Sequence, residues 1–250
     1  MDGSGETRLV VQRYNPTRDR QPWLQEYRLP YTNDMTVLDA LNQIKDHVDP
    51  TLTFRWSCRM GVCGSCGANV NGTPVLTCGT FIKSLKLPIR VGPLSNFPII
   101  RDLVVDIDDF LEKLSHVKPW IIRKGLDPED KELLQTPNEM DVYHQSSMCI
   151  NCMLCYAACP VYGLDKNFLG PAASALAYRY VMDSRDQAKN ERLSLVNSEE
   201  NGIWSCTLVG ECTVVCPKKV DPMFTIQRLK IMNAIEAAKT LKIIPTIEMK

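Results

Sequence analysis

Cysteine content restricts the possible structure and chemistry of this chain more than any other feature of its sequence. Eleven of its 250 residues are cysteine, and they fall into three groups within residues 58–78, 149–159 and 206–216. The start, MDGSGETRLV, lacks the basic and apolar segments of an export signal, so we expect a reducing compartment. An odd number of cysteines in such a compartment disfavours a disulfide framework. The cysteines are therefore predicted to bind metal.

The first cysteine group has the spacing of a plant-type [2Fe–2S] ferredoxin. Three cysteines follow one another as C-x4-C-x2-C in one glycine-rich loop, and the fourth lies beyond a predicted hairpin. Glycines in such a loop adopt positive φ and bring backbone N–H groups close to sulfur. A four-cysteine zinc site is the alternative, although zinc sites usually use two tight cysteine pairs. The predicted [2Fe–2S] ligands are Cys58, Cys63, Cys66 and Cys78.

The second cysteine group matches the run C-x2-C-x2-C-x3-C-P of two-cluster bacterial ferredoxins. In that run the first three cysteines hold one cluster and the fourth holds the other, so a second run is required. The third group supplies this run, with Val209 at the position of the middle ligand. The predicted [4Fe–4S] ligands are Cys149, Cys152, Cys155 and Cys216.

The remaining site has only three cysteine ligands, which are Cys159, Cys206 and Cys212. A cubane corner without a ligand loses its iron readily, so we predict a [3Fe–4S] cluster here. The alternative is that water or a non-cysteine ligand holds a fourth iron beside Val209, although hard oxygen ligands match a thiolate-rich site poorly. The three predicted sets together use every cysteine of the chain.

Hydrophobic patterning predicts mixed α and β structure in the first half. We expect strands at 9–11, 24–29 and 87–91, and a hairpin at Asn71-Gly72. A helix is expected after Thr36, because Thr36 and Asp39 have capping-box spacing. The buried stripe predicted for this helix is Val37, Leu41, Ile44 and Val48.

The second half reads as mainly helical. Helices are predicted at 108–116, at 171–183 and after Asp221-Pro222, and the polar residues 124–140 are predicted to be a long connection. The buried stripe predicted for the last helix is Ile226, Leu229, Met232 and Ile235. We therefore divide the chain into an α+β domain of residues 1–105 and an all-α domain of residues 106–250.

Net charge and hydropathy limit the kinds of partner that this chain is expected to bind directly. The chain has 29 basic and 29 acidic residues, which offers no electrostatic attraction for nucleic acid or for an anionic membrane surface. No apolar run approaches the roughly 18 residues that a membrane-spanning helix needs. Any membrane contact is therefore expected to come through a partner.

The three cysteine motifs, in this order, resemble the iron–sulfur subunit of the succinate dehydrogenase and fumarate reductase family. The resemblance covers nearly the whole chain. It rests on RWSCRMGVCGSC at 55–66, NFP at 96–98, RDLVVD at 101–106, FLGPAA at 168–173 and DSRD at 183–186.

This resemblance implies an N-terminal β-grasp domain of the plant-type ferredoxin kind, followed by a helical domain like bacterial ferredoxin. It also implies two partners: a flavoprotein with FAD, where succinate and fumarate interconvert, and a membrane anchor that helps to form a quinone site. The chain would relay single electrons and would carry no catalytic residue for the dicarboxylate step. Its expected place is peripheral, on the cytoplasmic or mitochondrial-matrix face of the membrane.

Quinone contacts in this family come partly from the region beside the [3Fe–4S] cluster. The matching positions are Pro160, Thr207, Gln227 and Lys230, and the last two share a helix face. For a lone helical lysine, a solvated side chain is the alternative.

The direction of electron flow is predicted from a few positions. Ubiquinone-linked succinate dehydrogenases often have Trp where this chain has Leu164, and His where it has Thr207. This chain lacks both, so it resembles menaquinol-linked fumarate reductases more closely.

Two competing functions share these motifs. A stand-alone ferredoxin-like carrier is one, although such carriers are usually short and strongly acidic. The iron–sulfur subunit of a thiol-linked fumarate reductase is the other, although those proteins commonly carry further cysteine-rich modules.

Overall fold

A computed structural model describes residues 5–125, 132–198 and 201–241. These residues form two compact units. The first consists of the described residues up to Phe110 together with Ile150–Ala158 and Val214–Lys218. The second consists of Leu111–Cys149, Cys159–Thr213 and the described residues from Lys219 onward.

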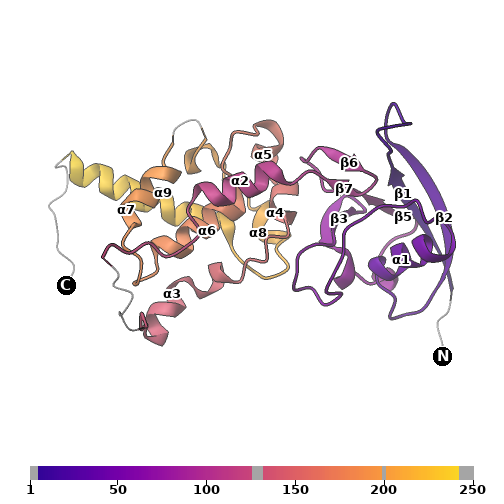
Figure 1. Ribbon diagram of the computed structural model, residues 1–250, viewed down its shortest axis with the longest axis horizontal. Coiled ribbons are helices and arrows are strands. Elements are labelled where there is room, and N and C mark those ends of the chain that lie inside the picture. Colours follow the sequence, from indigo (N-terminus) through magenta and orange to yellow (C-terminus); the bar gives the residue numbers. More distant parts are fainter. Residues whose placement is uncertain (1–4, 126–131, 199–200, 242–250) are drawn as a thin grey trace. The chain divides into compact units, whose positions relative to one another are not determined.

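A five-stranded mixed sheet is the framework of the first unit (Figure 1). Its order is β2-β1-β5-β3-β4, in which β1 and β5 are parallel and the other neighbours are antiparallel. Alternate residues of β1 are buried, as expected for a strand with one face on the core. The strands are β1 (Gly5–Arg13), β2 (Trp23–Tyr31), β3 (Gly67–Val70), β4 (Thr73–Leu76) and β5 (Ile89–Gly92), and β6 (Ile99–Arg101) pairs with β7 (Val104–Val105) in a separate ribbon.

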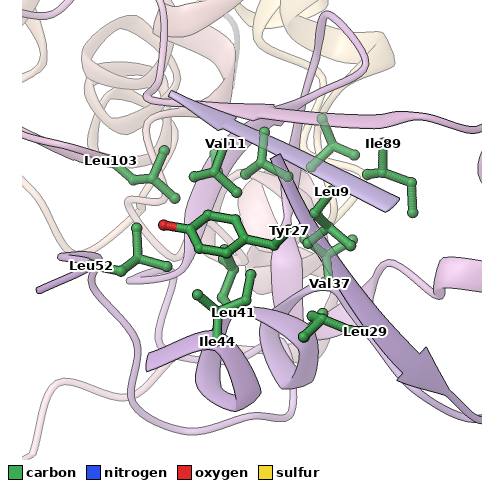
Figure 2. Packing of buried hydrophobic residues seen from close by; sticks show 14 of the residues in the cluster. Leu9, Val11, Tyr27, Leu29, Val37, Leu41, Ile44, Leu52, Ile89 and Leu103 are labelled. Carbon is green, nitrogen blue, oxygen red and sulfur yellow. The ribbon is translucent and has the colours of Figure 1, made fainter. Parts of the chain in front are cut away.

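Helix α1 (Val37–His47) covers one face of the sheet, and the predicted capping box at Thr36 and Asp39 is present. Figure 2 shows the helix side chains meeting those of the strands in one apolar cluster. Val48 was predicted to join this buried stripe, and that prediction is wrong. The helix ends at His47, and the Val48 side chain, one residue beyond it, is 56% exposed.

The predicted hairpin joins β3 to β4 through Asn71 (φ 50°) and Gly72 (φ 87°). Two successive left-handed residues are what a type I′ turn requires, and Asn-Gly is the sequence that adopts it most readily. The short turns η1 (Thr77–Gly79) and η2 (Ile82–Ser84) then lead to β5.

A buried guanidinium fixes the start of the first cysteine loop. Arg13 donates from Nε to Asp102 (3.1 Å) and from Nη1 to Asp49. Burial alone would raise the pKa of Asp49, but the hydrogen bond from Thr51, followed by that from Arg13, holds it below its usual value. The other oxygen of Asp102 accepts the N–H of Thr53 (2.9 Å). Because Thr53 lies five residues before Cys58, this network holds the entry of the loop against the sheet.

The second unit is helical, and α6 (Pro171–Val181) lies at its centre, packed against α3 (Pro137–Ser147), α7 (Lys189–Val196) and α9 (Pro222–Thr240). Its alanines are buried, and such small side chains allow neighbouring helices to approach closely. The other helices of the described residues are α2 (Asp108–His116), α4 (Leu154–Ala157), α5 (Pro160–Leu164) and α8 (Glu211–Val214), with a short turn η3 (Ile203–Ser205).

Two predictions for the helical half need correction. The connection expected to reach residue 140 ends earlier, because Thr136 and Glu139 form a capping box that starts α3 at Pro137. Residues 126–131 of that connection lie outside the described residues. On α9, Ile226 and Leu229 are fully buried as predicted, but Ile235 is 42% exposed. Repeated steps of three residues drift around a helix of about 3.6 residues per turn, so Ile235 lies off the buried face, which continues to Asn233.

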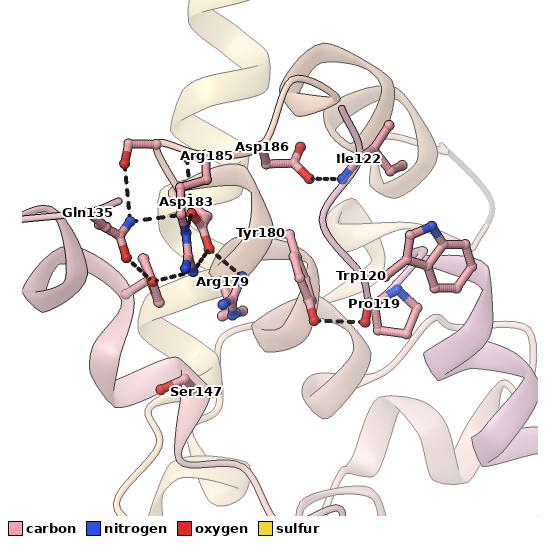
Figure 3. A network of polar contacts seen from close by, with 12 residues as sticks. Pro119, Trp120, Ile122, Gln135, Ser147, Arg179, Tyr180, Asp183, Arg185 and Asp186 are labelled. Carbon is pink, nitrogen blue, oxygen red and sulfur yellow. Dashed lines mark hydrogen bonds and ion pairs between the residues drawn. The ribbon is translucent and has the colours of Figure 1, made fainter. Parts of the chain in front are cut away.

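Two aspartates organise the polar contacts around α6 (Figure 3). Asp183 is paired with Arg179 (2.7 Å) and Arg185 (2.8 Å). Burial alone would raise the pKa of Asp183, but the hydrogen bonds and charge of Arg185, helped by Arg179, outweigh it and lower the pKa to about 2. Asp186 accepts the N–H of Ile122 (2.9 Å) and pairs with the fully buried Arg192 (2.7 Å).

Candidate iron–sulfur centres

The first cysteine loop folds its backbone around a sulfur atom. Cys58 Sγ accepts backbone N–H groups at 3.3–3.4 Å, and these come from Met60, Val62 and Cys63. The chain can turn this sharply because Arg59 (φ 58°) and Gly61 (φ 68°) have left-handed backbone. Successive N–H groups directed at one sulfur make a nest that stabilises negative charge.

All four predicted [2Fe–2S] cysteines gather at this nest. The Cys58 N–H, followed by Ser65, lowers the pKa of the Cys63 thiol to about 6. Burial, followed by the neighbouring Cys66, raises the pKa of the Cys78 thiol to about 11, and Cys58 also lies close enough to contribute. The structure therefore brings the solitary cysteine from beyond the hairpin back to the loop that carries the other three.

The chemistry of this donor set fits an iron–sulfur cluster. A thiolate-bound cluster is anionic, and N–H donors directed at its sulfur atoms tune it. Among the described residues, no three His, Cys, Asp or Glu side chains are arranged around a single metal-ion position. The assignment of the thiols to clusters therefore rests on their spacing, their neighbours and their donors.

The second cysteine run lies in the short segment that leads into α4. Asn151 (φ 53°) and Met153 (φ 65°) have left-handed backbone on either side of the buried Cys152. Cys155 lies on α4 itself, and Cys149 immediately precedes the segment. Cys216 belongs to the same compact unit as Cys152 and Cys155, although 61 positions separate it from the latter in the chain.

The other three cysteines line one small pocket in the second unit. Cys159, Cys206 and Cys212 all border it. Cys159 Sγ accepts the N–H of Tyr162 at 3.4 Å, and Cys206 Sγ accepts that of Leu208 at 3.4 Å. Burial, followed by the charge of Cys159, raises the pKa of the Cys212 thiol to about 12. The structure thus brings together the set for which the sequence offers only three ligands.

Val209 stands on the rim of this pocket and its side chain is 60% exposed. Its neighbours Leu208 (φ 57°) and Gly210 (φ 91°) are both left-handed, so the chain makes a sharp turn at this point. An apolar side chain therefore occupies the position at which the matching run has a cysteine.

The residues predicted for quinone binding lie partly around the same pocket. Pro160 and Thr207 line it, and both are exposed. Lys230 reaches it from α9, where its Nζ donates to the Cys206 carbonyl at 2.8 Å and lies 5.6 Å from the Trp204 ring centre. Gln227 is exposed on α9.

Sequence reasoning did not find the contact between Lys230 and Cys206, because 24 positions separate them. It also left the role of Asn96 open, although the NFP motif marked that position. Asn96 has φ 69° and donates to two carbonyls of α4. An asparagine beside an aromatic residue carries no general signal for this role.

Comparisons with known proteins agree with this geometry. A family model described as a 2Fe-2S iron-sulfur cluster binding domain matches residues 8–112, and one described as a 4Fe-4S dicluster domain matches residues 145–220. The sheet, the helical unit and these matches define an iron–sulfur electron-transfer protein of the α+β class, which confirms the predicted fold class.

Relatives identify the family. A fumarate reductase iron–sulfur subunit of Mycobacterium tuberculosis is 56% identical over 93% of this chain and 95% of its own length. One from Escherichia coli O6:H1 is 51% identical over 91% of this chain and 93% of its own length. A succinate dehydrogenase iron–sulfur subunit of Coxiella burnetii is 35% identical over 88% and 94%. The chain belongs to the family of iron–sulfur subunits of fumarate reductase and succinate dehydrogenase.

A solved structure supports the same assignment. A chain of the Mycobacterium smegmatis Sdh1 complex in the apo form matches with a TM-score of 0.84 and 26% identity, covering 98% of this chain and 100% of that one. The prediction that the sequence is nearer to the fumarate reductase type is confirmed by the identities above. Among the described helices, none is both long and apolar enough to cross a membrane.

Proposed function

We propose that this chain relays single electrons between a flavoprotein subunit, whose FAD interconverts succinate and fumarate, and a quinone in the membrane. Membership of the family and the three groups of thiols support this proposal. The clusters supply one-electron redox chemistry when bound, while the protein holds them and sets their environment. The dicarboxylate chemistry then belongs to the flavoprotein partner.

The pocket lined by Cys159, Cys206 and Cys212 is the observation that carries the proposal. Three cysteines line it, and Val209 stands where the matching run has a fourth, which supports a site with three ligands. We therefore assign a [3Fe–4S] cluster to this pocket. A three-iron centre beside a quinone site distinguishes a membrane-linked relay from a carrier with two cubane clusters.

The other two cysteine sets complete the relay. We assign [2Fe–2S] to the nest of Cys58 with its neighbours Cys63, Cys66 and Cys78, and [4Fe–4S] to Cys149, Cys152, Cys155 and Cys216. We also retain the division into domains 1–105 and 106–250 as a proposal. The [2Fe–2S] centre then faces the flavoprotein, and the [3Fe–4S] centre faces the quinone.

The quinone contacts proposed for this chain are Pro160, Thr207, Gln227 and Lys230. Pro160 and Thr207 line the three-thiol pocket, which supports their assignment. The ammonium group of Lys230 is held near the pocket by the Cys206 carbonyl (2.8 Å). A hydrogen-bond donor at this place is suited to the carbonyl oxygen of a quinone.

The direction that we propose is fumarate reduction with electrons from menaquinol. The higher identity to fumarate reductase subunits supports it, as does the presence of Leu164 and Thr207 at two positions of the quinone region. The chain would bind peripherally, through a membrane anchor subunit, on the cytoplasmic face or its mitochondrial equivalent.

Electron paramagnetic resonance of the purified complex tests the proposal. The oxidised complex is expected to show a [3Fe–4S] signal of about one spin per chain, and reduction is expected to add a [2Fe–2S] signal. The variant Val209→Cys supplies the missing thiol, which can hold a fourth iron. The oxidised variant complex should therefore lose the [3Fe–4S] signal and contain about one more iron per chain. Val142→Cys is the control, because it adds a thiol at an exposed position of α3. An oxidised wild-type complex without the [3Fe–4S] signal would refute the assignment.

A further inference from the structure

Two glycines of the first cysteine loop touch the second cysteine run. A Cβ atom added to Gly64 would lie 2.5 Å from the Ile150 carbonyl oxygen and 3.1 Å from Cys152 Cα. A Cβ added to Gly67 would lie 3.2 Å from the Cys152 carbonyl oxygen. Real side chains do not tolerate the first of these distances, so the two backbones are in direct contact. Gly64 and Gly67 flank Cys66, which is a predicted ligand of the first cluster.

Gly61 shows that this contact is not a general property of the loop. Its backbone is left-handed like that of Gly64, with φ 68° against 74°. A Cβ at Gly61, however, would meet no atom within 4 Å. Gly61 thus has the same backbone conformation without a close contact to the second run, whereas Gly64 combines that conformation with contact to Ile150 and Cys152.

Asn96 holds the second run in this position. Its Nδ2 donates to the carbonyl oxygens of Tyr156 (2.9 Å) and Ala157 (3.1 Å). These carbonyls belong to the last turn of α4, where the Ala158 N–H also reaches the Tyr156 carbonyl, so Asn96 adds a side-chain donor to the end of the helix. Asn96 therefore caps the short helix that carries Cys155.

Tyr156 anchors the same segment in apolar surroundings. Its side chain is fully buried and packs edge-on against Phe110, with ring centres 5.0 Å apart. The ring of Phe97, next to Asn96, lies 6.4 Å from it. The NFP motif thus contributes both a polar and an aromatic contact to the segment with the second ligand run.

We propose that Gly64, Gly67 and Asn96 are positioning residues that set the separation between the [2Fe–2S] and [4Fe–4S] centres, and with it the rate of electron transfer between them. The inference rests on the proposed function. Electron transfer through protein slows steeply with distance, and contact between two backbones is the closest approach that two ligand loops can make. Apolar side chains between the loops would hold the segment equally well but farther away.

The experiment uses the whole complex with Asn96→Gly and Asn96→Asp. Glycine keeps the positive φ and removes the amide, and aspartate keeps the size but replaces the donor with an acceptor facing two carbonyls. Asn71→Gly is the matched control, since Asn71 is also left-handed and hydrogen-bonded but lies in the hairpin. Gly64→Ala and Gly61→Ala form a second pair with similar backbone strain and different contacts.

The measurement is the microwave-power saturation of the reduced [2Fe–2S] signal, which reports spin coupling to the reduced [4Fe–4S] centre. Iron content and the rate of electron transfer between the two centres are measured on the same samples. We expect Asn96→Gly and Asn96→Asp to lose relaxation enhancement and to transfer electrons more slowly. Asn71→Gly should match the wild type, and Gly64→Ala should be affected more strongly than Gly61→Ala.

Unchanged coupling and rate in both Asn96 variants, with all clusters present, would overturn the inference. If Asn96→Asp does not assemble, Asn96→Gly still decides the question, because it introduces no charge. Failure of the proposed function gives a different result, since the wild-type complex would then lack one of the two reduced signals from the start.

Discussion

The buried pair of Asp186 and Arg192 is expected to control the stability of the segment before α3. Both side chains are fully buried and lie 2.7 Å apart. Arg192 also donates to the carbonyls of Lys118 (2.9 Å) and Trp120, and Asp186 accepts the N–H of Ile122 (2.9 Å). The variant Asp186→Asn keeps the size of the side chain and removes its charge, which leaves a buried guanidinium without its counter-ion.

The size of the effect follows from this burial. Removing one partner of a buried pair costs about 3–5 kcal/mol, because the remaining charge stays desolvated. Every 1.4 kcal/mol is a factor of about ten in an opening equilibrium. Hydrogen exchange followed by mass spectrometry should therefore show amides of residues 118–124 exchanging roughly a hundredfold to a few thousandfold faster in Asp186→Asn.

A neighbouring exposed pair provides the control. Lys118 and Glu191 form an ion pair whose side chains are 38% and 48% exposed. Glu191→Gln should change exchange by the equivalent of about 0–1 kcal/mol, because exposed pairs contribute little. Equal exchange in the two variants, or protection unchanged in Asp186→Asn, would refute the reasoning from burial.

Three further predictions follow from particular residues. The folded pKa of Asp183, about 2 against 3.8, contributes about 2 kcal/mol that is present above pH 4 and lost as pH falls toward 2. Hydrogen exchange of the wild type and of Asp183→Asn should therefore converge in acid, and a constant difference would contradict the sign. Thr136→Ala removes the cap of α3 and should cost about 1 kcal/mol in its local opening, measured by exchange against exposed Thr240→Ala. Gly202 lies four residues before Cys206, and the variant Gly202→Ala would place a Cβ 2.3 Å from the carbonyl oxygen of Val196, so the [3Fe–4S] signal per complex should fall. The control Gly79→Ala adds its Cβ in open space and should leave that signal unchanged.

Much of the fold could be predicted because its signals are local. The capping box at Thr36 and the Asn71-Gly72 turn each depend on a few consecutive residues, and both are present. The same kind of box at Thr136 was missed because the surrounding polar residues favoured a loop. Exposure was predicted less well: Val48 lies one residue beyond the end of α1, and Ile235 lies off the buried face of α9 because steps of three residues drift around the helix.

For the candidate sites, too, local features were predictable and contacts between distant residues were not. Cysteine spacing predicted three sets of ligands, and Cys159, Cys206 and Cys212 do line one pocket. The donors that surround these thiols were not predictable individually. Lys230 meets the Cys206 carbonyl only because α9 packs beside it, and no pattern in the sequence relates the two positions.

The sequence by itself determined which cysteines are available and how they are spaced, and it predicts how many ligands each centre has, since spacing is a property of a short, continuous chain. The replacement of one cysteine by Val209 is visible without any structure. Only the tertiary structure decided that residues 150–158 pack with the first loop, where Gly64 meets Ile150 and Asn96 caps α4. Such contacts join positions more than fifty residues apart, and they depend on how whole elements pack rather than on the residues next to them.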